Sequence, residues 1–335
     1  MSPADIAAKA RRELIARERA TARETLAFYA EALQRVRGEL VVVADLVAAT
    51  GDATERRRLL RRETRLETFE QRARVALTDY ADRAAIHITT LQEEAVGQAV
   101  GDAPRLMRSA QGPGLSWEFA PPNPAVPASV VGLSADGQPL GLVLREAAGD
   151  AASAARRELV VGIIRGKGPR EIGRRVTLAS GIARHRSLLI ARTEALRAYR
   201  VTTRSAFQQN TDVVKGWAWQ ATFDNRTCPA CWAMSGTEHG VDESLNSHPG
   251  CRCSMIPITR SWADLGFDDI PDARPPILDG PSAFDTLSAA DQRSILGPGK
   301  FDLYRAGTPL QDFATATRSQ RWGKGLKTTP LRDLV

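Results

Sequence analysis

Four cysteines and one histidine are the residues best suited to chemistry, and they lie close together in the sequence. They form the motif Cys228-Pro-Ala-Cys231, then sixteen other residues, then His248-Pro-Gly-Cys251-Arg-Cys253. Tetrahedral Zn(II) takes four thiolate or imidazole ligands, commonly as a close pair followed by a second close group. The spacing therefore predicts one structural zinc ion per chain, held by Cys228, Cys231, Cys251 and either Cys253 or His248.

The identity of the fourth ligand stays open, because five candidates compete for four positions. We prefer Cys253, since a thiolate binds Zn(II) strongly. His248 would then hydrogen-bond a thiolate or the Asp224 carboxylate, and Pro249 would hold it in an extended conformation. The alternative is that the cysteines are buried or redox-labile thiols without a metal. Four cysteines within 26 residues, beside a histidine, favour the metal.

A second motif consists of charged residues on an expected helix. Arg192 and Glu194 are two positions apart, so they point to different faces of the helix and cannot pair with each other. Each then needs a distant partner, for which the loop around Asp224 and Arg226 is a candidate. The alternative is an ordinary solvated helix face.

The positive charge of the chain is concentrated in one segment. The whole chain carries a net charge of +7, whereas residues 151–262 alone contain 17 basic and 8 acidic residues. Such an excess attracts polyanions or acidic protein surfaces. We therefore predict nonspecific contact with double-stranded DNA, or with an acidic partner, through Arg197, Arg200 and Arg204.

The motifs of several enzyme classes are missing from the sequence. It contains no P-loop, no H-E-x-x-H, no G-x-S-x-G and no H-x-E of a zinc deaminase. A His-Asn-His-like nuclease could be built from His239, Asn246 and His248, but a catalytic His248 would be lost to the zinc site. We expect no enzymatic activity, and keep a metal-dependent nuclease as the alternative.

The elements that must position these residues are mostly helices. Residues 1–100 are predicted to form a long helical hairpin, with apolar stripes from Leu26 to Val47 and from Leu59 to Leu91 and a break at Thr50-Gly51-Asp52-Ala53. We expect this hairpin to be the assembly element. The arginine-rich run from Arg56 to Glu63 is interpreted as its solvated face, and direct contact with DNA is the alternative.

The remaining segments differ in composition. Residues 101–150 are rich in proline and glycine and are predicted to be a linker or extended arm, with edge strands at 130–133 and 140–144. Residues 151–262 should contain a short helix at 170–176 ending at Ser180-Gly181, a helix at 182–210, a strand at 213–221 and the Cys/His loops. Residues 263–335 should be an extension with short helices at 289–296 and 310–317.

The fold class expected is mainly α, with a small α+β, loop-rich domain that contains the Cys/His cluster. The composition is that of a soluble globular protein, with 43% hydrophobic and 25% charged residues. No apolar run reaches the roughly 18 to 20 residues of a membrane helix, and the amino terminus lacks a secretory signal pattern. We therefore expect no membrane domain.

Four motifs, in this order, resemble the phage Mu F-like head morphogenesis family. They are Ile190–Glu194, Asn210–Asp212 with Trp217–Trp219, Asp224–Cys231 and His248–Cys253. The resemblance covers residues 150–262, and the stretch from Phe284 to Gln292 is similar to the tail that often follows this domain. The family consists of minor head, or minor capsid, proteins of tailed bacteriophages and prophages.

The resemblance implies a virion protein rather than an enzyme. Such proteins are expected at the portal vertex of the procapsid, with the portal protein and other procapsid components as partners, and in the host cytoplasm during assembly. They are expected to affect DNA packaging or delivery, with nonspecific contact to double-stranded DNA. The alternative is a nuclease that acts on phage or host DNA. Zinc follows from the cysteine spacing and not from the family.

Overall fold

The computed structural model describes residues 1–48, 54, 64–115, 117–320 and 322–334. The chain divides into two compact units, each drawn from several segments. Unit 1 comprises Met1–Ala16, Gln92–Val131 and Thr193–Val335, and unit 2 comprises Arg17–Leu91 and Gly132–Arg192. Removing residues 1–100 would therefore take away parts of both units.

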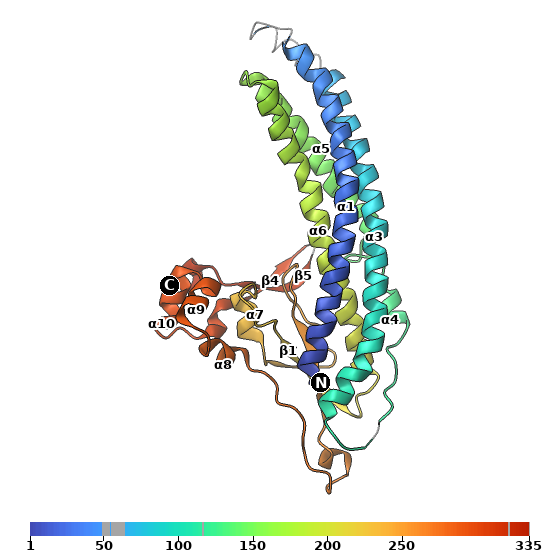
Figure 1. Cartoon of the computed structure of the whole chain (residues 1–335), viewed down its shortest axis with the longest axis vertical. Coiled ribbons are helices and arrows are strands. Elements are labelled where there is room, and N and C mark those ends of the chain that lie inside the picture. Colours follow the sequence, from blue (N-terminus) through green and yellow to red (C-terminus); the bar gives the residue numbers. More distant parts are fainter. Residues whose placement is uncertain (49–53, 55–63, 116, 321, 335) are drawn as a thin grey trace. The chain divides into compact units, whose positions relative to one another are not determined.

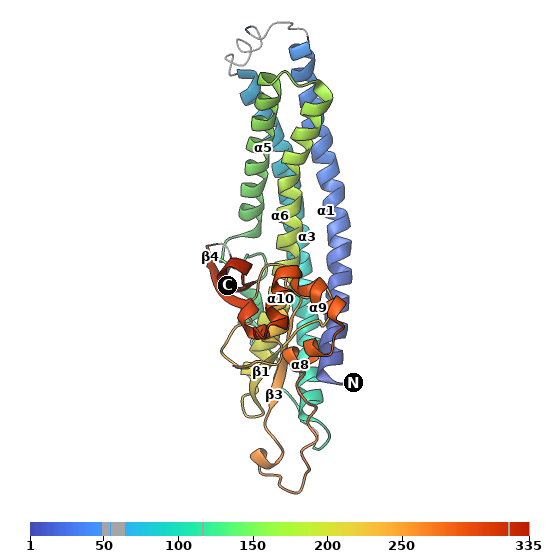
Figure 2. The same cartoon turned by 90° about the vertical axis from the view of Figure 1, so that its left-hand side faces the viewer.

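Unit 2 is a bundle of four long helices. Parts of α1 (Pro3–Ala48), α3 (Thr64–Gln111) and α6 (Pro169–Gln208) run beside α5 (Leu140–Ile164), as Figures 1 and 2 show. The apolar stripes meet inside the bundle, where Tyr29, Val36, Phe69 and Tyr80 are buried. Leu26, which we expected in the stripe, is instead exposed.

Ion pairs show that α1 and α3 are antiparallel. Glu31 pairs with Arg83, Arg35 with Asp79 and Glu39 with Arg72, at 2.5, 3.2 and 2.7 Å, so the partner number in α3 falls as that in α1 rises. The amino-terminal helical hairpin is thus present over the described residues. The break expected at Thr50–Ala53, the start of the second stripe at Leu59 and the arginine run from Arg56 to Glu63 lie outside them.

Helices occupy more of the chain than we expected. Helix α3 continues to Gln111 with Pro104 inside it, and α5 begins directly after Pro139. The stretch 140–144, expected as an edge strand, is therefore the first turn of a helix. The proline- and glycine-rich connection is confined to the segment between them, which contains one short helix, α4 (Ala125–Ala128).

Helix α6 is continuous through Ser180 and Gly181, where we expected a break. The Ser180 hydroxyl donates to the Val176 carbonyl oxygen, 2.8 Å away, so this buried polar group is satisfied within the helix. The prediction of two separate helices at 170–176 and 182–210 was therefore wrong.

Unit 1 contains a small antiparallel sheet in the order β2-β1-β3. Its strands are β1 (Val214–Gln220), β2 (Glu238–Gly240) and β3 (Ser254–Thr259), and β1 is the strand expected at 213–221. Trp217, Trp219 and Met255 pack in one buried cluster with three of the cysteines. The Cys/His region is therefore part of the hydrophobic core of unit 1.

The carboxyl-terminal part of unit 1 is built from short elements. They are α7 (Pro229–Met234), α8 (Gly280–Asp285), α9 (Ala289–Leu296), α10 (Pro298–Arg305), β4 (Ala314–Ser319), β5 (Gly323–Thr328) and single 3-10 turns at Ala263–Leu265, Leu310–Phe313 and Leu331–Asp333. Helix α9 was expected. The helix expected at 310–317 is instead a 3-10 turn followed by β4, since Thr315 and Thr317 suit the pairing with β5.

The described residues are thus mostly helical with two small antiparallel sheets, which confirms the expected mainly α fold with a small α+β region. Within the described residues, no helix combines the length and the apolarity that a bilayer-spanning segment requires.

Candidate metal centre

The first pair of cysteines lies at the start of helix α7. Cys228 is the N-cap and Pro229 follows it, where the fixed backbone angle of proline suits the first helical turn. The amide of Cys231 donates to the Cys228 carbonyl oxygen at 3.0 Å. Residues three apart in such a turn share one side of the helix, so both sulphurs point the same way.

The second group begins in a tight turn. The Cys251 amide donates to the His248 carbonyl oxygen at 3.2 Å, and Gly250 between them has a φ of +72°, which favours glycine. The Gly250 amide donates to the Thr193 hydroxyl of α6 at 2.9 Å. The turn therefore presents His248 and Cys251 together and is fixed to a helix.

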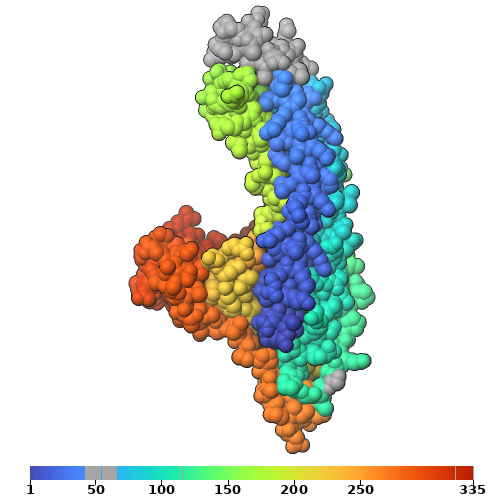
Figure 3. Space-filling model, viewed as in Figure 1, coloured from blue at the N-terminus to red at the C-terminus, as the bar shows by residue number. Residues whose placement is uncertain are grey.

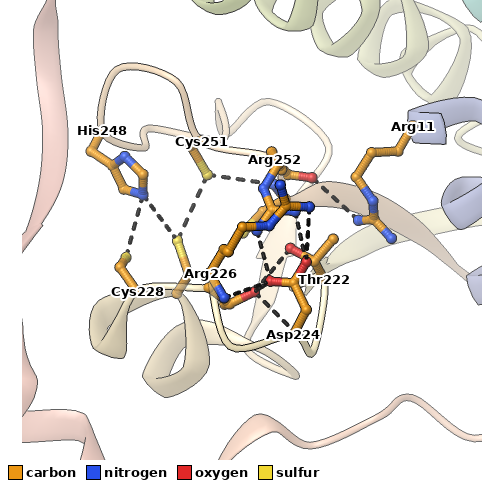
Figure 4. A network of polar contacts seen from close by, with 11 residues as sticks. Arg11, Thr222, Asp224, Arg226, Cys228, His248, Cys251 and Arg252 are labelled. Atoms are coloured by element: carbon orange, nitrogen blue, oxygen red, sulfur yellow. Dashed lines mark hydrogen bonds and ion pairs between the residues drawn. The ribbon is translucent and has the colours of Figure 1, made fainter. Parts of the chain in front are cut away.

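The two groups converge, as Figure 4 shows. His248 Nε2 lies 3.3 Å from Cys228 Sγ and 3.4 Å from Cys231 Sγ, and Cys231 Sγ lies 3.7 Å from Cys251 Sγ. With Zn–S near 2.3 Å and Zn–N near 2.0 Å, a tetrahedral site has edges of about 3.8 Å between sulphurs and about 3.5 Å between sulphur and nitrogen. The donor set and its spacing therefore fit a zinc ion, and this cluster could hold a metal.

Cys253 belongs to an overlapping group. The sulphurs of Cys231, Cys251 and Cys253 lie within 4.8 Å of one another, as do the ligand atoms of Cys228, Cys231 and His248. Cys231 is common to both groups. Cys253 is buried, and its own backbone amide donates to Cys251 Sγ at 3.4 Å.

The surroundings of the cluster favour a negative charge on a cysteine thiolate and a positive charge on His248. The contact with Cys231 lowers the pKa of the Cys228 thiol to about 4, against the effect of burial. Burial opposes a charge on His248, but its contacts with Cys228 and Cys251 raise its pKa to about 10. Burial raises the pKa of Cys253. The contact with Cys231 also lowers the pKa of Cys251, whereas the contact with Cys228 raises the pKa of Cys231. The cluster thus favours the thiolate, the form that binds metals, at Cys228 and Cys251 and the thiol at Cys231 and Cys253.

Asp224 and Arg252 join the two halves of the centre. Arg252 donates to both carboxylate oxygens of Asp224 at 2.7 Å, and Thr227 Oγ1 adds a bond of 3.0 Å. These contacts, the Arg252 pair first, lower the pKa of Asp224 to about 2. Asp224 precedes the first cysteine pair and Arg252 lies between Cys251 and Cys253, so the ion pair holds the two ligand segments together.

The three arginines predicted to contact DNA bind the chain itself. Arg200 donates to the carbonyl oxygens of Cys251 at 2.8 Å and Cys253 at 2.7 Å. Arg204 donates to the Asp242 carbonyl oxygen and the Ser244 hydroxyl. Arg197 pairs with the buried carboxylate of Glu194 at 2.5 Å. Their contact with DNA or an acidic partner stays a prediction.

The other charged residues also have partners, although not those we expected. Arg192 binds the Glu18 carboxylate within unit 2 at 2.7 to 3.0 Å. Arg226 is largely exposed, and its amide donates to Asp224 at 3.1 Å. The loop around Asp224 is therefore held by Arg252, whereas Arg192 binds Glu18 and Glu194 binds Arg197.

Sequence reasoning missed three residues that support the centre. Arg252 could have been found from the sequence. It is a cation between Cys251 and Cys253, and Asp224 is an anion just before the first cysteine pair, so an ion pair between them could have been expected. Thr193 and Arg11 carry no such signal. Arg11 is buried and donates to the Arg252 carbonyl oxygen at 3.2 Å, across 241 residues of sequence.

The histidines proposed for a nuclease have structural surroundings. The His239 ring stacks on Trp217 with centroids 4.3 Å apart, and contacts the Thr237 hydroxyl at 3.0 Å and the Glu243 carboxylate at 3.3 Å. Thr237 in turn donates its hydroxyl proton to the Met234 carbonyl oxygen at 2.7 Å. His248 lies among the thiols.

Comparison with known proteins gives one match. Residues 154–256 match the family model described as phage Mu protein F like protein, and this segment contains all five candidate ligands. The match confirms the resemblance over these residues and supports a phage Mu F-like protein, a family that indicates phage head morphogenesis. No curated protein and no solved structure matches the chain.

Proposed function

We propose that this chain is a minor head protein of a tailed phage or prophage, acting at the portal vertex in head assembly and in DNA packaging or delivery. The observation that carries the proposal is the family match over residues 154–256. The proposed partners are the portal protein and other procapsid components. The proposed locations are the virion and, during assembly, the host cytoplasm. The proposed role is structural, without an enzymatic activity.

The proposal includes one structural zinc ion. Sulphur and imidazole donors, mostly buried, are typical of structural rather than catalytic zinc sites. We assign the ligands as Cys228, Cys231, Cys251 and His248, because three distances among them, from His248 to Cys228 and Cys231 and from Cys231 to Cys251, match tetrahedral edges. Cys253 is then a buried thiol beside the site. This reverses the preference that the sequence suggested.

The proposal also includes nonspecific contact with double-stranded DNA. It is supported by the net charge of +9 in residues 151–262. Alanine at Arg200 would disturb the Cys251 and Cys253 carbonyls, so loss of binding in that variant would not identify a phosphate contact. The salt dependence of binding by the unaltered chain is the better test, because neutralised phosphates release counterions.

The role in the head is tested by deleting the gene and complementing it. We expect the chain in purified heads and virions, detected by mass spectrometry, and defective heads or poor DNA retention in its absence. Normal infectious particles that lack the chain would refute the proposal. Cleavage of supercoiled plasmid with Mg(II) or Mn(II), absent from an Asn246→Ala variant that keeps its zinc, would favour the nuclease.

The zinc assignment is tested with matched serine variants. Protein purified without added metal should contain about one zinc per chain. Cys253→Ser should keep it, and Cys251→Ser should lose it. Retention in Cys251→Ser with loss in Cys253→Ser would overturn the assignment, and less than about a tenth of an equivalent in the unaltered protein would refute the site itself.

A further inference from the structure

A groove between α5 and α6 in unit 2 is lined by side chains that the proposed function has not used. Its volume is about 440 Å³. Ala154 and Ala179 are its smallest lining residues, Leu178 and Ile182 are its apolar ones, and Arg157 and Arg174 are among its charged ones. The turn from α5 to α6 lies at the surface of this unit, shown in green in Figure 3.

The charges of this region are unbalanced. Residues 154–182 contain seven basic and two acidic residues. Both acids, Glu158 and Glu171, are paired with Arg175 at 3.2 Å. Arg157 and Arg174 are exposed and have no ion-pair or hydrogen-bond partner within the part of the chain that the structure describes. The groove thus has cations available for an external anion.

The same region carries exposed apolar side chains. Leu178 is 66% exposed, and Leu189 on the same helix is 41% exposed. With Ile182 they follow a spacing of four and seven residues, which places them on one face of α6. Ile164, at the end of α5, is 59% exposed. One exposed leucine is ordinary, but a stripe beside an open groove is typical of a contact surface.

We propose that this groove binds an acidic amphipathic helix of another protein. The inference rests on the assembly role proposed above and assigns it a surface. A groove between two antiparallel helices accepts the side-chain ridge of a third helix. Leucine-like residues of the partner would cover Leu178 and Ile182, while its flanking carboxylates would pair with Arg157 and Arg174. Duplex DNA fits less well, because phosphates gain nothing from covering Leu178.

The test uses the full chain and a fluorescent peptide of about 20 residues, kept helical by side-chain lactam bridges and used at a concentration at which it is monomeric. The peptide carries leucine on one face and glutamate on both flanks, and its counterpart carries lysine instead of glutamate. Arg157→Gln with Arg174→Gln, and separately Leu178→Gln, should weaken binding of the acidic peptide at least about tenfold. The lysine peptide should not bind.

Two matched variants control for charge and for polarity. Arg318→Gln with Lys327→Gln removes the same charge from the exposed β4–β5 hairpin, and Val75→Gln alters an apolar α3 residue that is 58% exposed. Both should bind as the wild type does, and circular dichroism should show equal helicity in all variants.

Three outcomes would refute the proposal that this groove binds an acidic helix. They are no binding of the acidic peptide by the wild type, equal binding by groove and control variants, and displacement of the peptide by a short DNA duplex that loses affinity in the same variants. The last outcome would identify a polyanion surface instead. Failure of the peptide test while the chain still enters heads leaves the proposed function standing. Absence of the wild-type chain from heads refutes that function separately.

Discussion

Replacing Arg200 with alanine is predicted to weaken zinc binding while leaving the helices folded. The Arg200 guanidinium donates to the Cys251 carbonyl oxygen at 2.8 Å and to the Cys253 carbonyl oxygen at 3.0 and 2.7 Å. Both cysteines are only 2% exposed, so water cannot easily replace the lost donor. Alanine therefore leaves two buried acceptors without this partner, in the segment that carries the proposed zinc ligand Cys251.

The size of the effect follows from those two carbonyls. An unsatisfied buried acceptor costs about 1–3 kcal/mol, which gives about 2–6 kcal/mol for the pair. Metal binding orders the loop, so this cost is expressed in the affinity for zinc, and even its lower limit corresponds to a roughly 30-fold higher Kd. Arg204→Ala is the matched control. Its bonds to Asp242 and Ser244 are exposed, and their loss should cost less than about 1 kcal/mol.

The assay is competition for zinc between the full chain and a chromophoric chelator, with far-UV circular dichroism to check folding. Arg200→Lys should fall between the wild type and Arg200→Ala, because a lysine is a single point donor that does not span both carbonyls as the guanidinium does. A Kd within about twofold of the wild type for Arg200→Ala, or an equal loss in Arg204→Ala, would refute the reasoning.

Three further predictions concern other parts of the molecule. Burial raises the pKa of Asp102 above 3.8, so the stabilisation by its protonated form is complete below about pH 4 and is lost as the pH rises. Urea denaturation should show that the wild type loses stability relative to Asp102→Asn over this pH range. Parallel stability profiles of the two proteins would contradict this prediction. Gly216→Ala puts a Cβ 2.5 Å from the His239 carbonyl oxygen and should destabilise the β1–β2 pairing by about 1–3 kcal/mol. Thermal unfolding measures this, with Gly38→Ala, which meets nothing within 4 Å, as the harmless control. A chelator should loosen unit 1 before unit 2, because all candidate ligands lie in unit 1; hydrogen exchange that rises equally in both units would count against it.

The candidate ligands were predictable because their signal is local. The two-residue spacer between Cys228 and Cys231 spans one helical turn, and the His-Pro-Gly sequence spans one β-turn. The spacing of the residues alone therefore reveals the candidate ligands. The arrangement on which our choice between Cys253 and His248 rests was not predictable in this way. It depends on how the second group is turned towards α7, and Gly250, Thr193 and Arg200 fix that orientation from elsewhere in the fold.

The secondary structure was predictable where the apolar period was long and regular. The amino-terminal hairpin and β1 follow directly from spacing, and the short helix α9 was also predicted. The errors fall where a local signal was overridden by packing. Ser180-Gly181 and Pro104 are breakers by composition, yet each lies within a helix. The partners of Arg192 and Arg200 were also missed, because they lie far away in sequence.

The residues that support the candidate metal centre are far apart in the sequence, and this affects when the centre can form during protein synthesis. Its supports extend from Arg11 in α1 to Leu326 in β5, which packs in the same buried cluster as the cysteines. At about 5–20 residues per second, a ribosome takes roughly 10–50 seconds to proceed from Arg11 to Arg252. Contacts so distant in sequence form late. The thiols therefore remain without their final packing until Leu326 has been synthesised, so the complete centre forms only after that point.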